Sequence, residues 1–264
     1  MTDPTPIDLA HAAMEAAPDD DAARLRFFER VADNELFLML AADPQGDAIS
    51  PDIFNVADGQ FALAFDRVER LADFAGASVR YVAIPGRALA GLLSGQGIGL
   101  GLNLEVAPSS ILIPPDALAW LSDILAQAHS GAPVAEEAQI SELRSPAGVP
   151  EALLSGLDTK LASAAGLAQM AYLTAVDYES GASGHLLAFI DATEGAETAL
   201  SRAVAEALVF SGIEAGAIDV AFFGASEPMA ARLARVGLRF DLPVSKGLNR
   251  TAPGSDPSKP PKLR

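Results

Sequence analysis

Residues 35–65 have the sequence ELFLMLAADPQGDAISPDIFNVADGQFALAF, and this stretch determines the class of fold. Its first six residues, 35–40, are largely apolar, which is typical of a buried strand. Further along, Asp58-Gly59 separates two apolar runs at residues 53–56 and 61–65. An Asp-Gly pair between two such runs is a strong signal for a β-hairpin. The stretch therefore predicts three strands, of which the last two form a hairpin.

Helices are predicted on both sides of these strands. Before them, Asp19-Asp20-Asp21 supplies a cap and first-turn negative charge to a helix over residues 22–33. After them, a helix begins near Asp66 and ends at Gly76. Glycine alternates with apolar residues over 98–104, so we expect a strand with close backbone neighbours there. Similar patterns predict strands at 79–84 and 111–113, a short helix through 89–93, and a longer helix opened by Pro114-Pro115.

The pattern breaks down over residues 126–145, where Gly131, Pro133 and Glu136-Glu137 indicate a linker. A second block follows, with helices at about 151–164, 196–208 and 226–237 and strands at about 169–177, 186–191, 218–223 and 238–242. Because helices and strands interleave in both blocks, the predicted fold class is α+β (mixed α/β), with two domains that each hold a mixed β-sheet flanked by helices.

These boundaries divide the chain into five segments. The predicted domains are residues 21–126 and 148–245, joined by a linker over 127–147. Residues 1–20 are polar and contain three prolines, so we expect a flexible N-terminus. Residues 246–264 are rich in Pro, Ser and Lys, and we expect a disordered basic tail.

Composition narrows the functional classes. The 264 residues include no cysteine, which excludes disulfides, thiolate nucleophiles, Cys-ligated zinc and iron–sulfur clusters. Residues 1–245 hold 34 acidic and 13 basic side chains, a net charge of −21, whereas the tail from residue 246 has a net charge of +4. Nucleic acid and anionic membranes are bound through cationic side chains, so we expect no nucleic-acid or membrane partner for the body.

The expected location is cytoplasmic. The first residues, MTDPTPIDLA, lack a basic segment followed by an apolar one, as a signal peptide would have. The weakly polar stretches at 88–104 and 161–176 contain glycines and fall short of the ~20 apolar residues of a membrane helix.

Metal-ligating residues are sparse. The histidines are His11, His129 and His185, and their spacing matches no metal-binding motif. Asp191 and Glu194 follow a predicted strand and would suit a hard cation, but a strand-end acid before a helix-starting acid is the plainer interpretation. We therefore predict no metal site and no cofactor.

Candidate nucleophiles and phosphate-binding groups are equally few. Ser183 and His185 are two residues apart and would share a face of a strand, although a hairpin rich in small residues explains them as well. The glycine run at 95–101 lacks the spacing of a dinucleotide or phosphate loop. Lys160 is the only lysine in residues 1–245, and it falls on a predicted surface helix.

Two acidic pairs, Glu29/Asp33 and Glu69/Asp73, stand four residues apart on predicted helices. This spacing places both carboxylates of a pair on one helix face. With one tryptophan and three tyrosines in the whole chain, few aromatics are present to line a sugar cleft between paired acids. We interpret both pairs as solvated helix faces.

Several short stretches of the first half follow one another in a recognisable order. They are residues 65–71 (FDRVERL), 81–89 (YVAIPGRAL) and 99–103 (GLGLN), with a helix over 115–121. In sequence and spacing these resemble the N-terminal domain of the SseB (enhanced serine sensitivity) family. Asp66 stands where that family usually has threonine.

The second half is similar to the family's C-terminal domain, through residues 150–153, 171–173 (AYL), 185–191 (HLLAFID) and 240–243 (FDLP). The resemblance covers most of residues 22–245. It implies a two-domain cytoplasmic bacterial protein without established catalytic residues, linked by name to serine sensitivity and to enhanced sulfurtransferase activity. A chain without cysteine cannot carry a persulfide on its own thiol, so a role in sulfur chemistry would be accessory.

Two functional hypotheses remain open. The first is a non-catalytic, protein-binding or regulatory module with an unidentified protein partner. Its candidate contact residues are Pro85, Gly86, Arg87 and Asn103, for which turn geometry and hydrogen bonding within the fold are an alternative explanation. The second is a small-metabolite hydrolase or transferase, which requires one deep pocket that joins Asp191, His185 or Ser183 with a hydrogen-bond donor.

Overall fold

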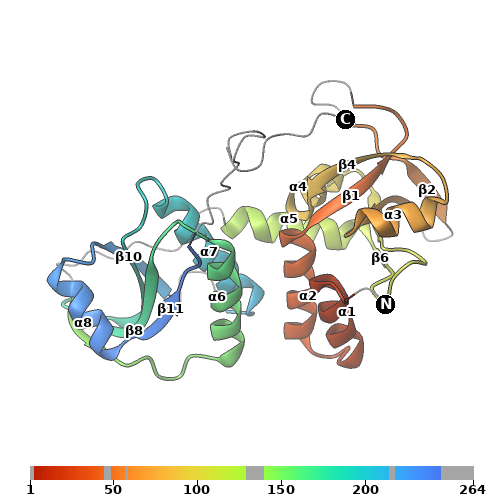
Figure 1. Cartoon of the computed structure of the whole chain (residues 1–264). Helices are drawn as coiled ribbons and strands as arrows, with labels where there is room; N and C mark the ends of the chain where they lie inside the picture. Colours follow the sequence, from red (N-terminus) through yellow and green to blue (C-terminus); the bar gives the residue numbers. More distant parts are fainter. Residues whose placement is uncertain (1–2, 45–48, 57–58, 129–139, 214–217, 245–264) are drawn as a thin grey trace, which may run out of the picture.

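Figure 1 shows the computed structural model of the chain, which describes residues 3–44, 49–56, 59–128, 140–213 and 218–244. Eight helices and eleven strands lie in these ranges, and the strands form two mixed sheets. The predicted α+β class with two sheet-containing parts is confirmed. We call residues 3–128 the first unit and residues 140–244 the second unit.

The first unit is built on a six-stranded sheet. Its elements are α1 (Pro6–Ala16), α2 (Asp21–Asp33), β1 (Glu35–Leu40), β2 (Ile53–Val56), β3 (Gly59–Phe65), α3 (Val68–Ala75), β4 (Arg80–Pro85), α4 (Gly86–Leu93), β5 (Ile98–Leu102), β6 (Ile111–Ile113) and α5 (Pro115–Ala128). The strand order is β4-β1-β3-β5-β6, with β2 also paired to β3. β2 and β3 run antiparallel with Val56 opposite Gly59, which confirms the predicted hairpin, while its residues 57–58 lie outside the described ranges.

The period of two along β1 separates the faces of this sheet. Leu36, Leu38 and Leu40 point into the larger core, which they share with α1, α2, α4 and α5. Met39 points to the opposite face and packs against Leu71 of α3. The short helix α3 is therefore the cover of a face that the other helices leave open.

Two glycines of β5 allow its neighbours to approach closely. A Cβ at Gly99 would lie 2.6 Å from the Ile113 carbonyl oxygen and 2.5 Å from the Phe61 ring. A Cβ at Gly101 would lie 2.6 Å from the Leu63 side chain. The close neighbours predicted from the alternating glycines are thus present.

The N-terminal segment is ordered as a helix, contrary to the expected flexible residues 1–20. Thr5 caps α1 by accepting a hydrogen bond from the Asp8 backbone N–H, and the Asp8 carboxylate accepts one from the Thr5 backbone N–H. Ile7 is fully buried in the first core, and the ring of the buried His11 packs edge-on against Phe27. The polar composition of this segment led to the prediction of flexibility, but an amphipathic helix needs only one apolar face to pack.

The second unit is built on a five-stranded sheet. Its elements are β7 (Ile140–Arg144), α6 (Glu151–Ser163), β8 (Met170–Tyr178), β9 (Ser183–Ile190), α7 (Glu197–Phe210), β10 (Ile218–Phe223), α8 (Pro228–Val236) and β11 (Leu238–Asp241). The order is β10-β9-β8-β11, with β7 also paired to β8, and only the β9–β10 pair is parallel. Helices α6 and α7 cover one face, and α8 covers the other.

β7 lies within the predicted linker, which is therefore shorter than expected. Its residues pair with the end of β8, where Arg144 forms an ion pair with Asp177. α5 also runs on to Ala128, so residues 129–139 are the part of the predicted linker outside the described ranges, and the predicted tail at 246–264 also lies outside them.

The two units contact each other through helices. α2 and α5 pack against α7 (Figure 1). Phe210, the last residue of α7, is buried in the core of the first unit. Among the helices in the described ranges, none combines the length and the apolar character needed to span a bilayer.

Candidate functional site

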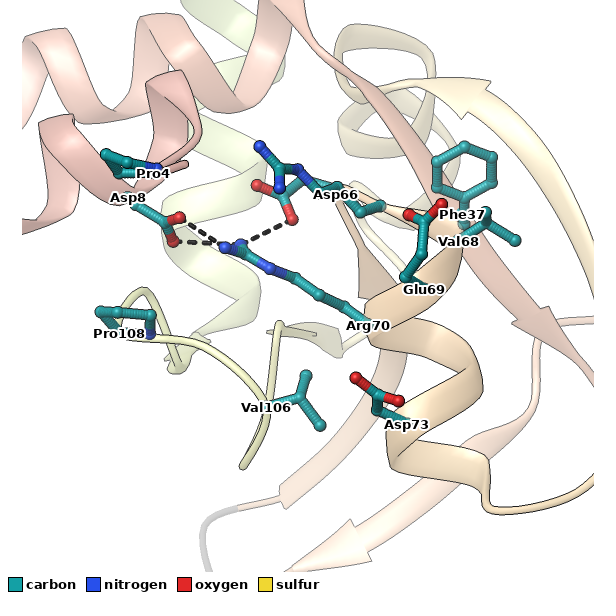
Figure 2. Close-up of a pocket in the computed structure, with 11 residues that line it drawn as sticks. Pro4, Asp8, Phe37, Asp66, Val68, Glu69, Arg70, Asp73, Val106 and Pro108 are labelled. Atoms are coloured by element: carbon teal, nitrogen blue, oxygen red, sulfur yellow. Dashed lines mark hydrogen bonds and ion pairs between the residues drawn. The ribbon is translucent and has the colours of Figure 1, made fainter. Parts of the chain in front are cut away.

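The stretch FDRVERL at residues 65–71 builds the most distinctive polar cluster of the first unit. It leaves β3 at Phe65 and enters α3 at Val68, so that Arg70 faces the start of α1 (Figure 2). The Arg70 guanidinium donates hydrogen bonds to the Asp8 carboxylate at 3.0 and 2.5 Å and to Asp66 Oδ1 at 2.8 Å. Its side chain is 11% exposed, and both carboxylates are nearly buried.

Uncharged side chains extend this cluster from the GLGLN stretch. Asn103 Oδ1 accepts a hydrogen bond from the Asp66 backbone N–H at 3.0 Å, and Asn103 Nδ2 lies 2.9 Å from Ser109 Oγ, which accepts its N–H. Ser109 Oγ in turn donates to Asp8 Oδ1 at 2.6 Å, while Thr5 Oγ1 donates to Asp66 Oδ2 at 2.6 Å. The left-handed backbone of Asn103, with φ of 52°, is one that asparagine tolerates better than most residues.

The hydrogen bonds fix the charge state of this cluster. Burial by itself raises the pKa of Asp8, but hydrogen bonds from Arg70, Ser109 and the Thr5 backbone outweigh it, and the pKa lies well below its ordinary value. Burial likewise opposes the charge of Arg70, yet the hydrogen bond with Asp8 and the field of Asp66 raise its pKa. Asp8 and Arg70 therefore form a charged pair, and the cluster holds α1, α3 and the segment after β5 together.

A groove of about 970 Å³ lies over this cluster. Figure 2 shows that it is bounded by the start of α1, by α3 and by the segment that carries Val106 and Pro108. Both apolar and charged side chains line its walls. The lining residues are Pro4, Asp8, Phe37, Asp66, Arg67, Val68, Glu69, Arg70, Asp73, Val106 and Pro108.

Of the four predicted contact residues, the structure places only Asn103 at this cluster. Pro85 ends β4 and Gly86 begins α4, where a Gly86 Cβ would lie 1.8 Å from the Val31 carbonyl oxygen, so glycine is required for α4 to approach α2. Arg87 contacts Glu206 of the second unit at 2.8 Å and Asp33 at 2.6 Å. All four residues thus have partners within the fold. Asn103 and Arg87 contact different residues, so they do not belong to one site.

The prediction that Lys160 lies on the surface is wrong, because the structure places it in the interior. It is 3% exposed, and its Nζ lies 2.6 Å from Asp33, 3.0 Å from Glu206 and 3.5 Å from Glu29. Together with Arg87, these residues form an ion cluster between the two units, which we call the inter-unit cluster. Glu29 is buried with its Oε1 lacking a hydrogen bond, so the interpretation of Glu29/Asp33 as a solvated pair was wrong for Glu29.

The two buried glutamates of the inter-unit cluster have pKa values shifted in opposite directions. Burial raises the pKa of Glu29, and the field of Lys160 only partly offsets this. Burial also acts on Glu206, but hydrogen bonding to Arg87 and the field of Lys160 prevail and lower its pKa. Sequence reasoning missed this cluster, although its signal was the rarity of lysine in the body of the chain.

The residues needed for the predicted enzyme do not meet. Ser183 Oγ donates to Asp177 at 2.6 Å, and His185 Nε2 lies 3.2 Å from the Ala147 carbonyl oxygen. Asp191 follows the far end of β9, where it accepts from the Ala225 backbone N–H at 2.8 Å. A strand rises ~3.3 Å per residue, so His185 and Asp191 are roughly 20 Å apart.

No metal centre is assembled in the described ranges, where no group of three or more histidine, aspartate or glutamate side chains is arranged to hold an ion. The buried His11 contacts Phe27, and His129 lies outside those ranges. The cluster around Arg70 and the groove above it are therefore the candidate functional site.

The fold and this site define an α+β protein with two sheets, whose first unit is organised around a buried, charge-paired arginine. Residues 9–120 match the family model of the SseB protein N-terminal domain. This match confirms the predicted resemblance of the first half of the chain to the SseB N-terminal domain, and its range includes Asp66, Arg70, Asn103 and Ser109. The resemblance of the second half to the family's C-terminal domain stays a prediction. No curated protein and no solved structure matches the chain.

Proposed function

We propose that this SseB-family chain is a non-catalytic accessory module whose first unit binds a protein partner in the groove above Arg70. One observation carries the proposal: the charges beneath the groove are all bound to one another. Arg70 is held by two carboxylates, and Asp8 accepts from Arg70, Ser109 and Thr5. A general acid, base or nucleophile needs a group free to exchange a proton or attack a substrate, and this cluster offers a fixed support instead.

The walls of the groove suit a polypeptide. Phe37, Val68, Val106 and Pro108 supply apolar surface, and charged side chains stand between them. Interfaces commonly combine such an apolar centre with a polar rim. The second unit, in this proposal, is the C-terminal SseB domain and acts with the first as one regulatory body in the cytoplasm. Without cysteine, the chain acts beside a sulfur-handling enzyme and does not carry the sulfur itself.

Site-specific photocrosslinking in the producing cell tests this proposal. Pro108 is exposed at the groove, and Leu238 is exposed on β11 of the second unit. A benzoylphenylalanine at position 108 is expected to give one discrete protein adduct, and the same probe at position 238 is expected to give none.

The adduct must depend on the groove. Val68→Glu places a charge in its wall and is expected to abolish the adduct, whereas Leu92→Glu, at an exposed leucine of α4, is expected to preserve it. Absence of an adduct from position 108, or an adduct insensitive to Val68→Glu, contradicts the proposal.

A further inference from the structure

Four carboxylates and two arginines line the groove, so its net charge is negative. Arg70 is paired with Asp8 and Asp66, and Arg67 donates a hydrogen bond to the Asp3 carbonyl oxygen at 2.8 Å but has no carboxylate partner among the described residues. Glu69 and Asp73, by contrast, are exposed and have no hydrogen-bond or ion-pair partner among the described residues. They stand four residues apart on α3, where like charges destabilise a helix.

Each free carboxylate lies beside apolar surface. Figure 2 shows Glu69 next to Phe37 and Val68, and Asp73 across the groove from Val106. The Phe37 ring is half-buried and meets the Tyr81 ring edge-on, and Tyr81 is 46% exposed. This arrangement follows from the fold, because the eight residues of α3 cover only part of their sheet face.

We propose that the groove binds a segment of a partner protein that presents arginine or lysine side chains next to apolar ones. The cations pair with Glu69 and Asp73, and the apolar side chains pack on Phe37 and Val106. This inference rests on the proposed function and specifies the chemistry of its partner.

An anionic partner fits the same groove poorly, despite its two arginines. A phosphate or carboxylate that bound Arg70 would have to displace Asp8 and Asp66 from a guanidinium that is 11% exposed. One that bound Arg67 would enter a groove lined by four carboxylates. The surrounding charge has the same sign, because residues 1–128 hold 19 acidic and 7 basic side chains. Such a field raises the rate at which cationic partners associate and repels anionic ones.

Fluorescence anisotropy with the full chain and defined peptides tests the inference. The probes are three capped, fluorescein-labelled octapeptides of alternating leucine with arginine, glutamine or glutamate. The arginine peptide is expected to bind, and the glutamine peptide about ten-fold more weakly, since two exposed ion pairs are lost. The glutamate peptide is expected not to bind.

A matched pair of double variants separates the groove from net charge. Glu69→Gln with Asp73→Asn is expected to weaken the arginine peptide about ten-fold at low salt. Glu142→Gln with Asp123→Asn changes the same side chains at exposed positions outside the groove, and less than about two-fold is expected. Any one of three results overturns the inference. The two double variants weaken binding equally, the arginine and glutamine peptides bind equally, or the arginine peptide does not bind.

The crosslink at position 108 distinguishes this failure from that of the proposed function. If the adduct forms equally in the chain with Glu69→Gln and Asp73→Asn, a partner binds the groove without using these carboxylates, and only the inference is wrong. If no adduct forms in either chain, the proposed function itself is wrong.

Discussion

Replacing Lys160 with methionine is the sharpest test of the inter-unit cluster. Methionine keeps much of the side-chain volume but removes a cation that lies within 3.5 Å of Asp33, Glu206 and Glu29. Among the described residues, Asp33 and Glu206 then retain only Arg87 at hydrogen-bond distance, and Glu29 retains only Arg30 at 4.0 Å. Glu29 and Glu206 are almost fully buried. Removing one partner of a buried ion pair costs about 3–5 kcal/mol, because the remaining charge has left water without compensation.

Thermal and urea unfolding at pH 7, followed by circular dichroism, measure this cost. A loss of 3–5 kcal/mol corresponds to a decrease in Tm of roughly 6–20 °C for a chain of this size. Arg24→Met is the control, since it breaks the exposed ion pair with Asp21 and is expected to cost less than about 1 kcal/mol.

The cost of Lys160→Met also depends on pH in a definite direction. Glu29 has a raised pKa, so its ionised form opposes folding, and this penalty disappears as pH falls towards its ordinary value of 4.5. The difference in stability between Lys160→Met and the original chain is therefore expected to narrow from pH 7 to pH 5. A variant as stable as Arg24→Met at pH 7, or a difference that widens on acidification, would refute the reasoning.

Three further predictions concern the first unit. Gly86→Ala is expected to destabilise the chain by about 3 kcal/mol in urea unfolding, because the new methyl group meets the Val31 carbonyl. Gly91→Ala in the same helix has open space around the new methyl group and is expected to stabilise the chain by roughly 0.5–1 kcal/mol. Equal effects of the two substitutions would contradict this packing. Asn103→Ala removes the partners of the Asp66 N–H and of Ser109 and is expected to cost about 1–3 kcal/mol, measured in the same way, and a cost near zero would show that the network is dispensable. Asp8 has a lowered pKa, so the stability that its carboxylate contributes is present above the ordinary pKa of 3.8 and is lost as pH falls below it. In an acid titration followed by circular dichroism, Asp8→Asn should therefore lose less stability on acidification than the original chain. Parallel titration curves would contradict the lowered pKa of Asp8.

Local patterns predicted most of the secondary structure. The strands at 35–40 and 111–113 match β1 and β6 residue for residue, and Gly76 ends α3 in a left-handed conformation. α1 was missed because Pro4, Pro6 and many polar residues suggested a mobile segment. The Thr5–Asp8 capping box, with proline at the first helical position, was the signal that could have identified it.

The candidate site could be predicted only in part, because its charges come from distant segments. The FDRVERL stretch was singled out by resemblance, but Arg70 pairs with Asp8, which is 62 residues away in the sequence. Lys160 lies 127 residues from Asp33. Periodicity describes one element at a time, so it cannot tell a solvated acid from one that meets a cation of another element.

Because of Phe210 and the inter-unit cluster, neither half of this protein is expected to be as stable alone as it is in the whole chain. Phe210 belongs to α7 but fills the hydrophobic core of the first unit, while Lys160 and Glu206 neutralise charges that the first unit presents. A fragment that ends with α5 would expose the apolar surface that Phe210 covers and would leave Glu29 and Asp33 without Lys160. Each half therefore depends on the other for part of its stability, and a change in the polarity of one side of this interface requires a compensating change in the other.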